Sequence, residues 1–112
     1  MQYKSQGKSS LGMEANVAAL LSYSFGFISG IIFYFLEKKN KFVRFHAMQS
    51  IVTFVALFVL NIAVKILPAI GWTAATLLAI IGAIIWVLLM IKACQGEYFK
   101  LPFIGDIAEK HS

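Results

Sequence analysis

Apolar residues form three long runs along the chain, separated by short polar stretches. The runs cover Ala15–Leu36, Ala47–Leu67 and Trp72–Ile91, with 22, 21 and 20 residues. A helix needs about 20 apolar residues to cross the hydrocarbon core of a bilayer. The pattern therefore predicts an all-α integral membrane protein with three transmembrane helices.

The segments between the runs complete this prediction. Pro68–Gly71 is a short turn, because Pro cannot continue a helix and Gly tolerates positive φ, so the second and third helices form an antiparallel hairpin. Residues 1–12 are polar and predict a flexible tail before a transmembrane domain over residues 13–96. Apolar residues are interleaved with basic ones over residues 41–46, and apolar and charged residues are mixed again over residues 97–112, which predicts interfacial segments at the membrane surface.

Composition agrees with lipid as the solvent. Hydrophobic residues make up 60% of the 112 residues and charged residues only 13%, against about 25% charged in soluble domains. The net charge is +5, but the basic residues stand in clusters between the apolar runs. This placement favours membrane orientation and argues against a nucleic-acid partner.

Counting Lys and Arg on the two sides of three spans predicts the orientation. Lys38, Lys39, Lys41, Arg44, Lys92, Lys100 and Lys110 would share one side, and Lys4, Lys8 and Lys65 the other. Cytoplasmic loops carry the excess of basic residues. We therefore expect a multi-pass protein of the cell membrane with its N-terminus outside and its C-terminus in the cytoplasm.

The first run contains small residues at every fourth position, namely Ala18, Ser22, Gly26 and Gly30. Such a row lies on one helix face and lets two helices approach closely in lipid. It predicts helix contacts either within one molecule or between copies in an oligomer.

The second run carries polar residues near its end. Asn61 needs a hydrogen-bond partner in hydrocarbon, and Thr76 on the facing helix is a candidate. The alternative is that Asn61 lines a polar pathway. Lys65 is the only charge within the runs, and its long side chain could reach the headgroups from its position three residues before Pro68.

A polar cluster marks the start of the second run: Arg44, His46, Gln49 and Ser50. These residues predict either an anchor at the helix start or a contact with lipid headgroups or a partner protein. His46 has no Asp, Glu or Cys at ligand spacing, and Cys94 is the only cysteine. We expect no metal site, no cofactor and no catalytic residues.

Four stretches carry a family resemblance: Leu11–Leu21, Phe42–Ser50, Ile91–Ala93 and Leu101–Glu109. The chain resembles the small prokaryotic membrane proteins called Tic-twenty-like, or the uncharacterised UPF-type membrane family. The resemblance implies a relation to a membrane subunit of the chloroplast inner-envelope import translocon and to magnetosome membrane proteins. It implies fold and location more than activity.

Together these features predict a non-enzymatic membrane scaffold or adaptor that assembles with itself or with a membrane-protein partner. The alternative is a subunit of an oligomeric pore or translocation assembly, in which Asn61 and Lys65 would line a wet path. A membrane enzyme would need convergent acid–base or metal-binding residues, and the sequence offers no such group.

Overall fold

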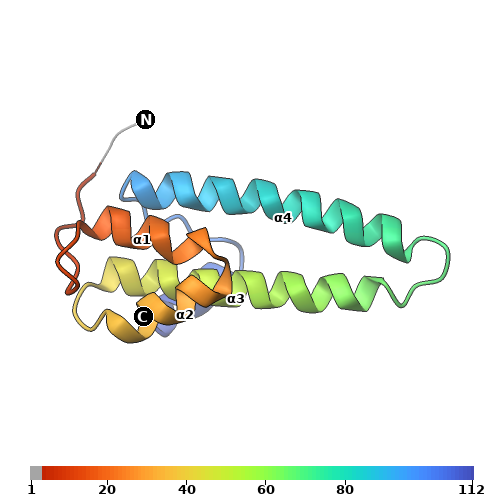
Figure 1. Ribbon diagram of the computed structural model, residues 1–112, viewed down its shortest axis with the longest axis horizontal. Coiled ribbons are helices and arrows are strands. Elements are labelled where there is room, and N and C mark those ends of the chain that lie inside the picture. Colours follow the sequence, from red (N-terminus) through yellow and green to blue (C-terminus); the bar gives the residue numbers. More distant parts are fainter. Residues whose placement is uncertain (1–3) are drawn as a thin grey trace.

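Five α-helices follow one another in the computed structural model, which describes residues 4–112 (Figure 1). They are α1 (Ala15–Ser24), α2 (Phe27–Leu36), α3 (Lys41–Val64), α4 (Gly71–Cys94) and α5 (Ile104–Lys110). The predicted all-helical fold class is confirmed.

Helices α3 and α4 form the long antiparallel hairpin that the sequence predicts (Figure 1). Each has 24 residues, with a mean hydropathy of 2.1 for α3 and 2.7 for α4. At 1.5 Å per residue each helix is about 36 Å long, enough to cross a membrane. Within residues 4–112, these are the two helices with both the length and the apolar composition to do so.

Helix α3 begins six residues before the predicted start at Ala47. The side chain of Asn40 accepts a hydrogen bond from the backbone N–H of Val43 at 3.2 Å and so caps the helix. Phe42, Val43 and Phe45 are buried in the first turns. The predicted interfacial segment at this position is therefore the first part of α3.

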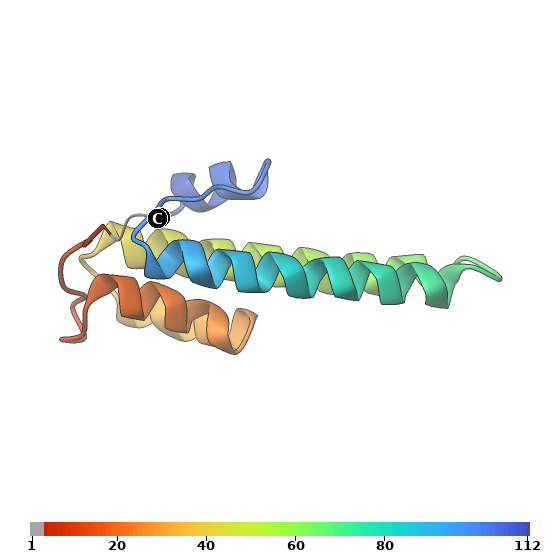
Figure 2. The same ribbon diagram turned by 90° about the horizontal axis from the view of Figure 1, so that it is seen from above.

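The first apolar run is not one helix. Helix α1 ends at Ser24, the chain turns at Phe25 and Gly26, and α2 folds back beside α1 (Figures 1 and 2). Each of the two helices has ten residues, which rise about 15 Å, half of the roughly 30 Å hydrocarbon core. The prediction of a first full span is therefore replaced by a helical hairpin that reaches halfway.

The turn forms at Gly26 for conformational and hydrogen-bonding reasons. Gly26 has φ 63° and ψ −138°, a conformation that residues with a Cβ rarely adopt. The Ser50 hydroxyl of α3 donates to the Gly26 carbonyl at 2.9 Å, and the Ser29 hydroxyl of α2 donates to the Ser22 carbonyl at 2.9 Å. The Trp86 indole of α4 donates to the Tyr23 carbonyl at 2.6 Å.

Side chains from three helices thus satisfy the carbonyl groups that the turn exposes. A break in a membrane helix is tolerated only where such partners exist, because lipid supplies none. The turn therefore has the hydrogen-bond partners that a helix break inside a bilayer requires.

Small residues bring α1 and α2 close to the long hairpin. Ala15, Ala18 and Ala19 have no exposed surface and pack with α3 and α4. On α2, a Cβ added to Gly30 would lie 2.9 Å from the Ala47 carbonyl oxygen and 3.0 Å from Ser50. The small-residue row therefore serves packing within one molecule, the first of the two readings of the sequence.

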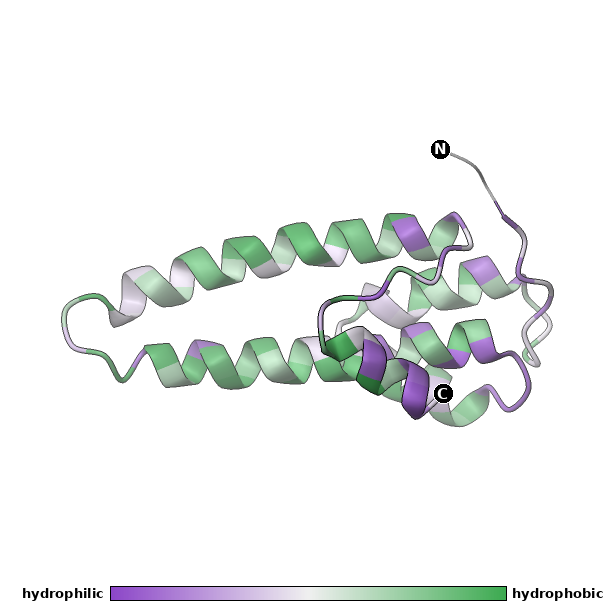
Figure 3. Cartoon of the chain, turned by 180° about the vertical axis from the view of Figure 1, so that it is seen from behind, coloured by the Kyte–Doolittle hydropathy of each residue, from purple (hydrophilic) through white to green (hydrophobic). Residues whose placement is uncertain are grey.

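The polar parts of the chain gather at one end, which we call the base (Figure 3). The base contains the start of α1, the α2–α3 loop, the end of α4 and the two terminal segments. The opposite end, the far end, is the α3–α4 turn. The C-terminal segment, residues 97–112, packs on the face of α3 opposite to α1 and α2 (Figure 2).

The N-terminal tail also lies at the base. The Lys4 backbone N–H donates to the Gln95 carbonyl at 2.7 Å, and the Gln6 side chain donates to the Gly96 carbonyl at 2.7 Å. The sequence predicted a flexible tail here; residues 1–3 of that tail lie outside the described residues. The tail therefore joins the end of α4, and the described parts of both terminal segments lie at the base.

Candidate functional site

A buried polar network lies where α1, α3 and the C-terminal segment meet. The Tyr23 hydroxyl is 2.6 Å from Nδ1 of His46, and Nε2 of Gln49 donates to the same hydroxyl at 3.0 Å. All three side chains have no exposed surface. Helix α3 positions His46 and Gln49 one turn apart on the face that meets α1.

The hydrogen bonds of His46 define where its protons lie. Nε2 of His46 is 2.8 Å from the Glu97 carbonyl oxygen, which can only accept, so Nε2 carries a proton. Nδ1 is then the acceptor for the Tyr23 hydroxyl, which in turn accepts from Gln49. The bonds run in one consistent direction, and each ring nitrogen of His46 has a partner within the chain.

Gln49 attaches the C-terminal segment to α3. Its Nε2 donates to the Phe99 carbonyl at 2.8 Å, and its Oε1 accepts from the Leu101 backbone N–H at 3.1 Å. An amide is suited to this position because it donates and accepts at once, as a strand neighbour would. The side chain therefore replaces a backbone partner for the extended residues after α4.

Two asparagines hold the N-terminal tail. The Asn16 amide donates to the carbonyls of Lys4 and Cys94 at 2.8 and 3.0 Å, and its oxygen accepts from the Gln6 backbone at 3.0 Å. The Asn40 amide donates to the carbonyls of Gln6 and Lys8 at 3.0 and 3.1 Å. The tail is thus bonded to α1, α3 and α4 together.

Glu37 is a buried carboxylate at the centre of the base. It accepts from the Ser10 hydroxyl at 2.5 Å, from the Ser10 backbone N–H at 2.9 Å, and from the backbone N–H groups of Lys39 and Asn40 at 3.2 and 3.0 Å. Burial raises the pKa of Glu37, but the hydrogen bonds from Ser10, Asn40 and Lys39 outweigh it and hold the pKa below its ordinary value. The charged form is therefore the one that the fold stabilises.

We expect Glu37→Gln to destabilise the protein at neutral pH by about 2 kcal/mol, since buried bonds to a charged group each contribute about 1.5–3 kcal/mol. A group with a lowered folded pKa stabilises the fold above its unfolded pKa, and this contribution disappears as the pH falls through the folded pKa. The wild type should therefore lose stability below the ordinary value of 4.5, and the variant should lose less. Denaturant unfolding in detergent across this range measures both effects.

Glu97→Gln is the matched control, because the Glu97 side chain is exposed and, within residues 4–112, forms an ion pair only with Lys92, at 3.2 Å. An acid response that is the same in wild type and Glu37→Gln would show that Glu37 does not couple folding to pH.

Arg44 connects the α2–α3 loop with the C-terminus. Its guanidinium donates to the carbonyls of Tyr34 and Glu37, both at 2.8 Å, and to the Ser112 main-chain oxygen at 3.1 Å. It also lies 4.2 Å from the centre of the Tyr34 ring, at cation–π distance. The guanidinium therefore fixes the end of the chain against α2.

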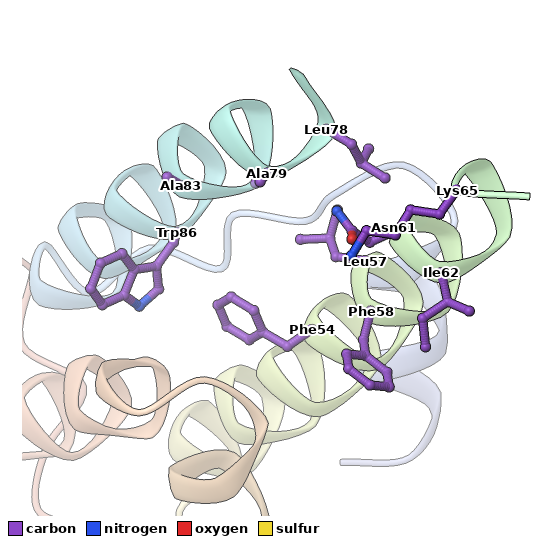
Figure 4. A pocket seen from close by; sticks show the side chains of 11 residues that line it. Phe54, Leu57, Phe58, Asn61, Ile62, Lys65, Leu78, Ala79, Ala83 and Trp86 are labelled. Carbon is purple, nitrogen blue, oxygen red and sulfur yellow. The ribbon is translucent and has the colours of Figure 1, made fainter. Parts of the chain in front are cut away.

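The far half of the α3–α4 hairpin contains an apolar pocket of about 370 Å³, lined mainly by aliphatic and aromatic side chains (Figure 4). Asn61 lies in it and donates to the Ala75 carbonyl at 3.0 Å. The predicted partner Thr76 instead donates to the Trp72 carbonyl in its own helix at 2.9 Å. The choice of Thr76 was wrong because the α4 carbonyl, and not a side chain, faces Asn61.

Lys65 directly follows Val64, the last residue of α3, whereas the sequence pattern predicted it within the second transmembrane helix. It is exposed, and its Nζ is 4.7 Å from the centre of the Trp72 ring. This position next to a tryptophan is typical of the headgroup region.

The structure separates the predicted site residues into two groups. Arg44, His46, Gln49 and Ser50 lie together at the base, and Asn61, Lys65 and Thr76 lie at the far end. The predicted headgroup contact of His46, Gln49 and Ser50 is wrong, because all three are buried and bonded within the chain.

Sequence reasoning missed several residues that organise the base: Tyr23, Glu37, Asn40 and Trp86. A polar residue within or beside a long apolar run was the available signal in each case, because such a residue must find a partner inside the protein.

Comparison with known proteins identifies relatives across nearly the whole chain. A membrane protein of the UPF0132 group from Methanocaldococcus jannaschii is 51% identical over 106 residues, covering 95% of this chain and 96% of the relative. A second one from the same organism is 48% identical, covering 90% and 72%. One from Archaeoglobus fulgidus is 46% identical, covering 88% and 95%.

No solved structure matches the chain, and the comparisons do not show the relation to the chloroplast translocon that the resemblance implied. The relatives are named membrane proteins, which agrees with the two long apolar helices. A family model matches residues 8–108, which include the base, the α1–α2 hairpin and both long helices. On this match, the chain belongs to the magnetosome magnetite crystal formation protein family.

Proposed function

We propose that this protein is a non-enzymatic structural component of the cell membrane, a scaffold whose base lies in the cytoplasm. The observation that carries the proposal is that the polar groups of the base form hydrogen bonds within the chain. Tyr23, His46, Gln49 and Glu37 all bond to other parts of the same molecule. Groups that hold a fold together in this way are not placed to bind or transform a substrate.

The distribution of charge supports the cytoplasmic base. Of the ten Lys and Arg residues, only Lys65 lies at the far end, and the other nine lie in the base half. An excess of basic residues marks the cytoplasmic side. The helical hairpin thus makes the asymmetry stronger than three spans would, because Lys4 and Lys8 join the basic side.

The family description concerns magnetite crystal formation, and we propose a role for this chain in the membrane rather than on a mineral surface. Four of the five carboxylates are already paired: Glu37 with Ser10 and the loop, Glu97 with Lys92, and Asp106 and Glu109 with Lys100. The fifth, Glu14, has no hydrogen-bond partner for its Oε1 among the described residues, but this oxygen is buried. A mineral-binding surface would need acidic groups free to bind iron.

Assembly with further copies or with a membrane partner remains part of the proposal. A contact between copies would lie elsewhere than on the small-residue row, since Ala18, Ser22 and Gly30 are buried against the chain's own helices.

The pore alternative rests on Asn61 and Lys65, and ion flux through liposomes tests it. We expect no flux at high protein density, because Asn61 already bonds to Ala75 and the pocket around it is apolar. Asn61→Leu should weaken the α3–α4 contact by about 1 kcal/mol without creating or removing flux. Thr76→Val, which removes a hydroxyl from the exposed face of α4, is the matched control.

Flux in the wild type that Asn61→Leu abolishes, and that Thr76→Val retains, would reject the scaffold and favour the pore. Circular dichroism of each variant in the same liposomes establishes that the helices are intact.

A further inference from the structure

The two halves of the molecule differ in thickness. The base half contains α1, α2, the first half of α3, the last half of α4 and the C-terminal segment. Among the described residues, the far half contains only the other halves of α3 and α4 and the turn between them (Figures 1 and 2). On α3, every buried residue lies between Phe42 and Thr53, and none from Phe54 to Val64. The packing partners of α3 other than α4 therefore end halfway along it.

The α1–α2 hairpin ends in an apolar tip. Phe25 in the turn is 78% exposed, and Phe27 and Ile28 beside it are also exposed. Because the hairpin is about 15 Å long, this tip lies near the midplane when the base is at the headgroups. Its exposed rings then contact acyl chains.

The C-terminal segment has a tip of the same kind. Leu101 and Pro102 lead to Phe103, which is 84% exposed and turns the chain with φ 64° into α5. The segment then runs back toward the base, where its last residues bond to Arg44 and Tyr34. Three of its charges are paired, since Lys100 contacts Glu109 at 2.6 Å and Asp106 at 3.7 Å. Lys110 is exposed at the end of α5, next to the residues that bond at the base.

Gln49 and His46 hold this segment at the depth of the second and third turns of α3, through Phe99, Leu101 and Glu97. Two re-entrant elements, one on each face of α3, therefore occupy the same half of the membrane. The far half has no counterpart within residues 4–112 (Figure 2).

From this shape we propose that the protein is a membrane wedge that senses and promotes curvature. The two re-entrant elements add about three helix-sized cross-sections, each about 10 Å across, to the base-side leaflet alone. An inclusion that widens one leaflet is better accommodated where that leaflet is convex, and insertion into one leaflet is sensitive to curvature in this way. The ligand is a bilayer that bends away from the base.

This inference deepens the proposed structural role and rests on it. With the base in the cytoplasm, the favoured membrane is convex toward the cytoplasm, as in an invagination or a vesicle that buds inward. The wedge shape comes from the difference between the base half and the far half, so the preference for a bilayer that is convex on the base side holds for either orientation.

Sorting of the purified full chain among single liposomes of mixed diameter tests the wedge. Cys94 is exposed, lies at the base and is the chain's single cysteine, so a dye placed there reports the protein. An impermeant quencher then separates molecules with the base outside from those with the base inside. Molecules with the base outside should rise severalfold in density per membrane area as the diameter falls, and molecules with the base inside should show the reverse.

Two double variants assign the effect to the tips. Phe25→Ser with Phe103→Ser weakens both re-entrant elements and should flatten the dependence on diameter. The matched control, Phe58→Ser with Leu77→Ser, changes residues of the far half that are 62% and 57% exposed and should sort like the wild type. Circular dichroism and trypsin resistance show whether each variant is folded.

Equal density in small and large liposomes, with folded wild-type protein, would overturn the wedge, and so would an equal loss of sorting in both double variants. Flux measured in the same liposomes keeps the two proposals distinct. Sorting together with ion flux would reject the scaffold and retain the wedge. If the protein shows no sorting and no flux, the wedge is rejected and the scaffold is retained.

Discussion

A cysteine at Lys8 and a cysteine at Lys39 will both escape a membrane-impermeant thiol reagent in intact cells, whereas a cysteine at Ala69 will react. Lys8 and Lys39 have exposed side chains at the base, on either side of the α1–α2 hairpin. Because the hairpin returns to the side from which it started, the two positions share one side of the membrane. Ala69 lies in the α3–α4 turn at the far end.

The experiment uses a Cys94→Ser background, because Cys94 is exposed and would otherwise react. Labelling after permeabilisation shows that each cysteine is reactive when the reagent can reach it. Three spans predict the opposite for the tail: Lys8 would label while Lys39 would not, and this outcome would reject the hairpin. Labelling at both base positions, with protection at Ala69, would retain the fold and reverse its orientation.

The α3–α4 hairpin was predictable because its signals are local. Two apolar runs of spanning length stand on either side of Pro68–Gly71, and the short turn leaves the helices no choice but to lie antiparallel. At the end of that turn, a Cβ on Gly71 would lie 2.7 Å from the Val64 carbonyl oxygen. The lengths of the two apolar runs, the Pro and Gly of the turn and the lack of a side chain at Gly71 thus all indicate a helical hairpin.

The α1–α2 hairpin was not predictable from the same kind of pattern. Its 22 apolar residues have the length of a span, and Gly26 is as common in helix contacts as in turns. The turn is stabilised by Ser50 and Trp86, which lie 24 and 63 positions away from the carbonyls they bind. Serines at positions 22, 24 and 29 were the one local indication of a break.

The polar stretch at the start of α3 also combines a local signal with contacts that depend on distant residues. Its residue types marked it as important, but its partners could not be read from the sequence. Gln49 bonds to Phe99 and Leu101, about 50 residues away, and His46 bonds to Glu97. Without these contacts, exposure to headgroups was the natural interpretation, and the fold gives the residues a buried role instead.

Gln49→Leu is expected to release the C-terminal segment from α3. Leu keeps the approximate volume but removes the partners of the Phe99 carbonyl, the Leu101 N–H and the Tyr23 hydroxyl. A buried polar group without a partner costs about 1–3 kcal/mol, so the free energy of unfolding should fall by about 3–5 kcal/mol. Denaturant unfolding in detergent measures the loss, and faster trypsin cleavage after Lys100 reports the released segment.

Thr53→Val provides the contrast one turn further along α3. The Thr53 hydroxyl is buried and, among the described residues, has no hydrogen-bond partner. Replacing it by a methyl group of similar size leaves nothing unpaired, so stability should stay the same or rise by about 1 kcal/mol. If Gln49→Leu proved as harmless as Thr53→Val, the network would not hold the C-terminal segment in place, and the widening of the base-side leaflet would rest on α1 and α2 alone.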